Sequence, residues 1–160
     1  MSKLLQLLEK DCTLTTQQLA AMTGMTEEEV LRERARLEEE RIILGYEAIV
    51  DWDRTQREAV TALIEVSVTP QRGEGFDRIA QRIYQYEEVE SLYLMSGGAY
   101  DLTVIISGRT LKEVAHFVGE KLAPIEGVTG TATHFILKKY KEKHLFFPVQ
   151  ETQEERFVFE

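Results

Sequence analysis

The chain has 160 residues, of which 43% are hydrophobic and 29% charged, and its formal net charge is −9. This composition indicates a globular protein with a real core, in one domain or two small ones, and its acidity argues against non-specific binding to nucleic acid or anionic membranes. The single cysteine, Cys12, excludes an intrachain disulfide and a Cys-based zinc site, and no apolar run approaches the ~18 residues that span a bilayer. We therefore expect a soluble, cytoplasmic protein with no signal peptide, cofactor or metal site.

The first third of the sequence predicts three short helices. Two pairs of residues have the spacing of a capping box, Thr15 with Gln18 and Thr26 with Glu29, so one helix is expected to begin after each threonine. Gly24 is placed to end the earlier of these two helices. Two short helices joined by a glycine-containing turn have the spacing of a helix-turn-helix.

The segment 42–50 predicts a small hairpin, or wing, after the third helix. Two runs rich in β-forming residues meet there at Gly45. The polar and non-periodic residues 51–59 then predict a linker. We expect residues 1–50 to form a winged helix-turn-helix domain.

From residue 60 the pattern predicts strands and helices in turn. Alternating or helical periodicity occurs in six segments: strands over 60–69, 89–95, 100–106 and 128–140, and helices over 76–84 and 111–122. The order β-α-β-β-α-β is that of the ferredoxin-like fold. The fold class is thus α+β, with a ferredoxin-like domain over 60–143 and a C-terminal tail over 144–160.

Several stretches resemble the Lrp/AsnC family, also called feast/famine regulators. The most telling are Gln18-Leu19-Ala20, Gly24-Met25-Thr26, Gly98-Ala99-Tyr100-Asp101-Leu102 and Ile125-Glu126-Gly127-Val128, and the resemblance covers about residues 3 to 140. It implies an N-terminal DNA-binding domain and a C-terminal domain that binds a small effector, commonly an amino acid. It also implies a homodimer formed through the sheets, which often assembles further into tetramers or octamers.

The third helix is expected to contact double-stranded DNA through Thr26, Arg32 and Arg36. A helix-turn-helix reads the major groove with its second helix, and Arg32 and Arg36 lie four residues apart, so they share one side of it. The helix departs from the family at Glu27–Glu29, where small polar residues are more usual. It also departs at Glu33, where a basic residue is often found, and at Arg34, where an apolar core residue is usual. Residues 1–58 contain eight basic and thirteen acidic residues. The alternative is a solvated helix whose acids only stabilise its N-terminus.

The effector is expected to bind at Gly98, Tyr100 and Asp101, with Thr131 and Thr133 nearby. Adjacent glycines let backbone N–H groups approach a ligand carboxylate, and the Asp101 carboxylate suits a ligand ammonium. The alternative is a hairpin turn in which the aspartate accepts hydrogen bonds from local backbone.

Other features leave their roles open. The basic run Lys138–Lys143 suits either a DNA contact or the protection of a strand edge, and the aromatic tail suits either an added strand or a mobile end. The sequence shows no phosphate loop, dinucleotide fingerprint or acid–base pair of an enzyme. We predict a DNA-binding transcriptional regulator that responds to a metabolite. The alternative is a sensor or interaction protein whose acidic helix-turn-helix no longer binds DNA.

Overall fold

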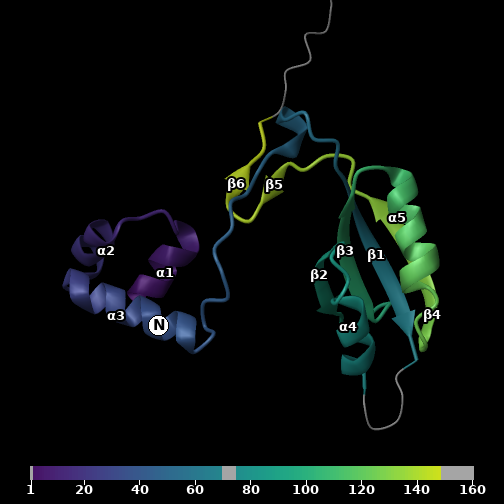
Figure 1. Ribbon diagram of the computed structural model, residues 1–160, viewed down its shortest axis with the longest axis horizontal. Coiled ribbons are helices and arrows are strands. Elements are labelled where there is room, and N and C mark those ends of the chain that lie inside the picture. Colours follow the sequence, from purple (N-terminus) through teal and green to yellow (C-terminus); the bar gives the residue numbers. More distant parts are fainter. Residues whose placement is uncertain (1, 70–74, 149–160) are drawn as a thin grey trace, which may run out of the picture. The chain divides into compact units, whose positions relative to one another are not determined.

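The computed structural model describes residues 2–69 and 75–148, and within them the chain forms two compact units (Figure 1). The first contains the chain up to Val50 together with Lys141–Phe146, and the second contains Asp51–Tyr140. Residues 141–146 thus cluster with the first unit, whereas we expected 60–143 to form one domain. Within the described ranges, no helix is long and apolar enough to cross a membrane. The tail beyond Pro148 lies outside the described residues.

The first unit is built on three helices: α1 (Lys3–Lys10), α2 (Thr16–Thr23) and α3 (Glu27–Glu39). Both predicted capping boxes are confirmed, since Thr15 and Thr26 each accept a hydrogen bond from the backbone three residues later. Gly24 ends α2 with a φ of 80°, as predicted. The helices enclose a small apolar core of four buried side chains: Leu4, Leu8, Leu19 and Val30.

The wing predicted around Gly45 is wrong. Residues 44–50 form neither strand nor helix, and Gly45 lacks the positive φ that a tight two-residue hairpin uses at its first central residue. The physical reason lies at the end of α3, where Arg41 takes a φ of 59° and the backbone N–H groups of Ile42 and Ile43 both donate to Leu37 O. Ile43 then packs against the core of the three helices, so its apolar side chain stabilises the helix end rather than a hairpin.

The second unit contains the four-stranded sheet. Its elements are the short η1 (Trp52–Arg54), β1 (Val60–Val68), α4 (Asp77–Ile83), β2 (Val89–Leu94), β3 (Leu102–Gly108), α5 (Leu111–Phe117), the π-helical η2 (Val118–Leu122) and β4 (Val128–Phe135). The strands lie in the order β2-β3-β1-β4 and every neighbouring pair is antiparallel. This confirms the predicted β-α-β-β-α-β order and the mixed α+β class.

The end of β4 corrects the predicted strand 128–140. The strand stops at Phe135, and the chain forms β5 (Lys141–Glu142) and β6 (Leu145–Phe146), which pair only with each other. Lys138 and Lys139 therefore lie outside the sheet. Lys141 of the same basic run lies in β5, so the protection of a strand edge stays a prediction for that residue only.

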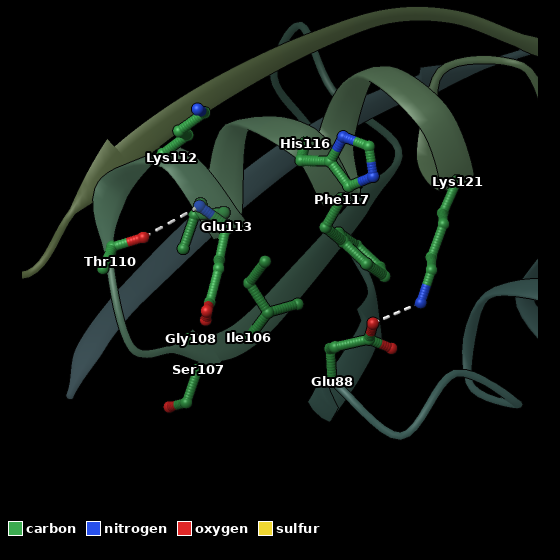
Figure 2. A pocket seen from close by; sticks show the side chains of 11 residues that line it. Glu88, Ile106, Ser107, Gly108, Thr110, Lys112, Glu113, His116, Phe117 and Lys121 are labelled. Atoms are coloured by element: carbon green, nitrogen blue, oxygen red, sulfur yellow. Dashed lines mark hydrogen bonds and ion pairs between the residues drawn. The ribbon is translucent and has the colours of Figure 1, made fainter. Parts of the chain in front are cut away.

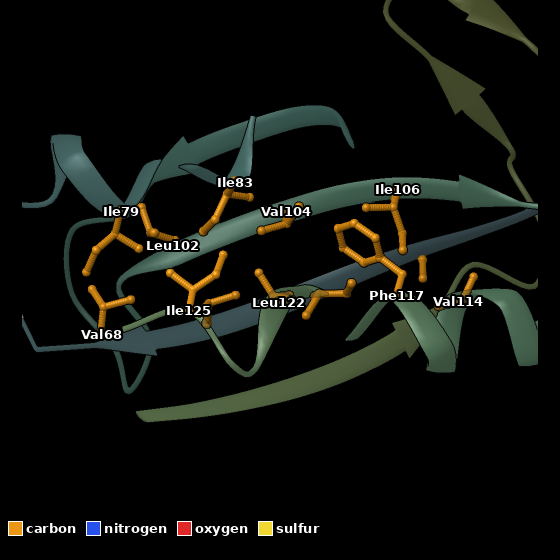
Figure 3. Packing of buried hydrophobic residues seen from close by; sticks show 13 residues of the cluster. Val68, Ile79, Ile83, Leu102, Val104, Ile106, Val114, Phe117, Leu122 and Ile125 are labelled. Atoms are coloured by element: carbon orange, nitrogen blue, oxygen red, sulfur yellow. The ribbon is translucent and has the colours of Figure 1, made fainter. Parts of the chain in front are cut away.

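One face of the sheet carries the core (Figure 3). Every second residue of β1 from Ala62 to Val68 is buried, as the period-2 geometry of a strand requires. These side chains meet buried residues of β3 and of both helices, among them Val104, Ile106, Ile79, Ile83, Phe117 and Leu122. The sheet is thus fixed in one register, because a shift by one residue would expose this row.

Gly127, before β4, is a position where only glycine fits. Its φ is +95°, and an added Cβ would lie 2.7 Å from Ile79 Cδ1 and 3.3 Å from Thr69 O. We expect Gly127→Ala to lower the free energy of unfolding by ~1–3 kcal/mol, through backbone strain and overpacking. Chemical denaturation measures this change.

Gly119→Ala is the matched control. Gly119 lies in η2 without a positive φ, and an added Cβ would meet no atom within 4 Å. The free energy of unfolding should change little, or rise slightly, because alanine restricts the unfolded chain. Equal losses in the two variants would contradict the steric account of Gly127.

Candidate functional site

The N-terminus of α3 is held by Thr26. Its Oγ1 accepts a hydrogen bond from Glu29 N at 3.2 Å, and Thr26 N donates to Glu29 Oε2 at 2.8 Å. The Thr26 hydroxyl also donates to Glu29 Oε2 at 3.1 Å. The bond that Thr26 N donates to the Glu29 carboxyl is the main cause that lowers the pKa of this carboxyl, and the bond from the Thr26 hydroxyl is the second. The hydroxyl expected to contact DNA is therefore engaged in the cap, although the residue is exposed.

Arg32 and Arg36 are both exposed, but their surroundings differ. The Arg32 side chain makes no hydrogen bond or ion pair with any residue that the structure describes, and it contributes only a favourable charge interaction to Glu29. Arg36 instead forms ion pairs with Glu33 of the same helix and with Glu40, the residue after it, at 2.7 Å and 2.6 Å for the shortest N–O pairs. Glu33 first, and then Glu40, raise the pKa of the Arg36 guanidinium.

Arg34 joins α3 to the segment that follows it. Its Nε lies 3.0 Å from Tyr46 Oη and 3.2 Å from Glu38 Oε1, and its guanidinium carbon lies 4.7 Å from the Tyr46 ring centroid. The Tyr46 hydroxyl donates to Glu38 Oε1 at 2.8 Å, and burial is the main cause that raises the pKa of this phenol. This cluster was not predicted. An arginine at a position where the family usually has an apolar core residue was its only signal in the sequence.

The loop before β3 has the backbone geometry expected of two glycines. Gly97 and Gly98 have φ of 80° and 105°, conformations that other residues rarely adopt. Asp101 Oδ2 accepts a hydrogen bond from Val68 N at 2.9 Å, and Asp101 N donates to Val66 O at 3.0 Å. The carboxylate thus closes the end of β1, a strand distant in the sequence rather than the local backbone of the turn alternative, while Oδ1 accepts no hydrogen bond from the described residues.

The predicted effector residues lie beside the C-terminal half of β1, the threonines on β4 and Asp101 just before β3. Thr131 pairs with Val66 and Thr133 with Ile64, so both threonines share the sheet face that carries the core. Tyr100 is half-buried beside Asp101. The structure therefore brings the five residues to the region around the C-terminal half of β1, while the threonines and Asp101 lie on different neighbours of that strand.

A hollow of about 560 Å³ lies at the other end of β3, where α5 begins (Figure 2). Its floor is apolar, and its rim carries Glu88, Lys112, Glu113, His116 and Lys121. Figure 2 shows Lys121 paired with Glu88, and Lys121 holds the pKa of that carboxyl below its usual value. None of the predicted effector residues lines this hollow. Within the described residues, no cluster of His, Cys, Asp and Glu is arranged to hold a metal ion.

Comparison with known proteins identifies the family. A family model described as the Lrp/AsnC ligand binding domain matches residues 61–146. The HTH-type transcriptional regulator YugG of Bacillus subtilis (strain 168) is 46% identical over 141 residues, which cover 88% of this chain and 84% of that protein. The chain belongs to the Lrp/AsnC family. The resemblance read from the sequence motifs is confirmed.

Two further relatives of this Lrp/AsnC chain are also transcriptional regulators. The Bkd operon transcriptional regulator of Pseudomonas aeruginosa is 34% identical over 137 residues, covering 85% of this chain and 88% of that protein. The crystal structure of a Neisseria meningitidis transcriptional regulator in complex with L-Met matches with a TM-score of 0.69 and 25% identity, over 92% of this chain and 94% of that one. These relatives are transcriptional regulators and not enzymes.

Proposed function

We propose that this chain is a sequence-specific DNA-binding transcriptional regulator that responds to a small metabolite, an amino acid. The observation that carries the proposal is the helix α3, which begins at a complete capping box after a tight turn and exposes Arg32. Together α2 and α3 act as a helix-turn-helix, whose second helix enters the major groove. The names of the relatives support this proposal.

Arg32→Ala tests the DNA-binding part. If Arg32 contacts a base edge, the variant should bind the operator ~1–3 kcal/mol more weakly, which is roughly 5- to 150-fold, and lose specificity at one position. If it contacts a phosphate, all sequences should be weakened alike and the salt slope should fall by ~1. Footprinting on the protein's own promoter, followed by a salt-dependent band shift, distinguishes the two contacts.

Arg82→Ala provides the charge-matched control for that experiment. Arg82 is an exposed residue of α4, in the other unit, so the substitution removes the same charge from an element outside the helix-turn-helix. Its operator affinity should match that of the wild type. Unchanged affinity in Arg32→Ala would argue that α3 does not read DNA.

The effector part of the proposal places an amino acid at Gly98, Tyr100 and Asp101, with Thr131 and Thr133 nearby. Gly97 and Gly98 expose backbone donors for a carboxylate, and Asp101 Oδ1 is available to an ammonium. The match of residues 61–146 to a ligand-binding domain, and the L-Met bound by the Neisseria relative, support an amino acid.

A second candidate function is a metabolite sensor whose acidic first unit does not bind DNA. Two observations favour it: Glu27–Glu29 occupy the first turn of α3, and Arg36 is already neutralised by carboxylates. A protein of this kind would bind the amino acid but shift no DNA, specific or not, at any salt concentration. The band shift described above therefore distinguishes it from the regulator.

We also propose that the protein is at least a homodimer, with tetramers or octamers as further assemblies. Large apolar side chains remain exposed along β2 and after β4, including Tyr93, Leu94 and Leu137. Closed two-fold assembly is the commonest way in which such surfaces are covered. Light scattering at micromolar concentration should give at least twice the mass of the chain, and a monomer would contradict the proposal.

A further inference from the structure

Arg36 is paired with two carboxylates, one in α3 and one at the residue that follows it. Nη2 and Nε donate to the two oxygens of Glu33, at 2.7 Å and 2.9 Å, and Nη1 donates to Glu40 Oε2 at 2.6 Å. Glu33 thus accepts two parallel hydrogen bonds from the guanidinium, the same bidentate geometry in which a phosphate binds an arginine. All three nitrogens of the side chain are engaged.

A competing anion can displace Glu33 and Glu40 from Arg36. The side chains of Arg36 and Glu40 are 47% and 49% exposed, and ion pairs this open to water are individually weak. A DNA phosphate offers the guanidinium the same geometry and a comparable charge. Glu33 and Glu40 therefore compete directly with phosphate for Arg36.

We propose that Glu33 and Glu40 restrain Arg36 and so suppress the binding of DNA of arbitrary sequence. This inference rests on the proposed DNA-binding function. Any complex that takes up Arg36 must leave two carboxylates unpaired beside the phosphate backbone. A cognate site offsets this cost through base contacts that arbitrary DNA lacks, so the two acids raise specificity at the expense of affinity. Arg32, which has no such partners among the described residues, is the arginine of α3 that engages DNA first.

The test measures binding to a fluorescent duplex of arbitrary sequence by the full chain. The double variant Glu33→Gln/Glu40→Gln keeps the side-chain shapes and removes both competing charges. It should bind more tightly than the wild type, and its salt slope should be steeper by ~0.9, the value for one additional phosphate contact. The ratio of the two dissociation constants should then change about 3.5-fold between about 50 and 200 mM salt.

Two controls isolate the role of Arg36. Glu39→Gln removes one carboxylate charge next to Glu40, half of what the double variant removes, from a residue with no ion pair to Arg36, and should leave the salt slope unchanged. Glu33→Gln/Glu40→Gln combined with Arg36→Ala should lose the steeper slope, because the cation that the acids restrain is gone. Circular dichroism of each variant checks that α3 is still formed.

Each outcome decides the matter. A gain that persists in the Arg36→Ala background overturns the inference, because the acids would then repel phosphate directly rather than through Arg36. If the double variant binds the duplex with the same affinity and salt slope as the wild type, the inference is overturned but the proposed DNA-binding function is not. If the double variant does not bind the arbitrary duplex, the inference fails. If, in addition, neither the wild type nor any variant binds the footprinted operator, the proposed DNA-binding function fails as well.

Discussion

Asp101→Asn is expected to abolish amino-acid binding in practice while leaving the fold intact. The substitution removes the negative charge proposed to pair with the ligand ammonium, and losing a desolvated charge pair costs ~2–5 kcal/mol, roughly a 30- to 5,000-fold loss of affinity. The fold should survive because the asparagine carbonyl oxygen can still accept the hydrogen bond from Val68 N, which the carboxylate accepts at 2.9 Å. Calorimetric titration with a panel of amino acids measures the effect.

Asp101→Ala separates the structural role from the binding role. Alanine leaves Val68 N without its acceptor, so this variant should lose ~1–3 kcal/mol of unfolding free energy in addition to ligand affinity. Thermal unfolding in the absence of ligand should therefore rank the wild type and Asp101→Asn together, above Asp101→Ala. If a ligand is found that binds the wild type and Asp101→Asn equally, Asp101 has no ammonium role, and the loop is only a turn.

Phe117→Ala should cause the largest loss of stability in the second unit, ~3–5 kcal/mol, which is the usual cost of truncating a buried aromatic side chain. Phe117 is 3% exposed and packs edge-to-face against Tyr86, with ring centroids 5.6 Å apart and an interplanar angle of 89°. Truncation leaves a cavity between α5 and the sheet and removes that aromatic contact. Urea denaturation followed by circular dichroism measures the change.

Tyr84→Ala is the aromatic control for this measurement. Tyr84 follows α4 and is 57% exposed, so its removal should change the free energy of unfolding by no more than ~0.5 kcal/mol. The first unit has its own core, so its transition should be unaffected by Phe117→Ala if the two units unfold independently. A loss similar to that of Tyr84→Ala would contradict the packing assigned to Phe117.

Rules that use only neighbouring residues, such as capping-box spacing and strand alternation, predicted the structure correctly where a few adjacent residues decide it. Thr15 with Gln18, and Thr26 with Glu29, form the capping boxes that their spacing predicts, because each box is made within one helical turn. The period-2 pattern of β1 likewise matches its observed burial, since alternation follows directly from strand geometry.

Local rules failed where the same residues had a better non-local partner. The β-rich run around Gly45 predicted a hairpin. Ile43 instead packs against the core of the three helices, and the residues after α3 form no paired strand there. The last strand was predicted five residues too long. After Phe135 a further strand pairing is made instead between Lys141–Glu142 and Leu145–Phe146. An added strand was one of the two alternatives for the tail, but the sequence did not indicate its partner.

The candidate sites show the same division. The resemblance carried by the motifs and their order suggested the family and the residues to examine, among them Arg32, Arg36 and Asp101. Whether each charge is available depends on partners that only the tertiary structure reveals: Arg36 is paired with Glu33 and Glu40, and Asp101 closes the end of β1 with one of its oxygens.

The sequence by itself determined the helix starts, the alternation of the strands and the α+β class, because capping and periodicity are properties of short segments. Only the tertiary structure decided the strand order β2-β3-β1-β4, the absence of a wing at Gly45 and the joining of Arg34 to Tyr46 across twelve residues. Those features depend on which apolar surfaces and charges meet once the chain is folded, and such encounters are set by the competition among many distant partners rather than by any one segment.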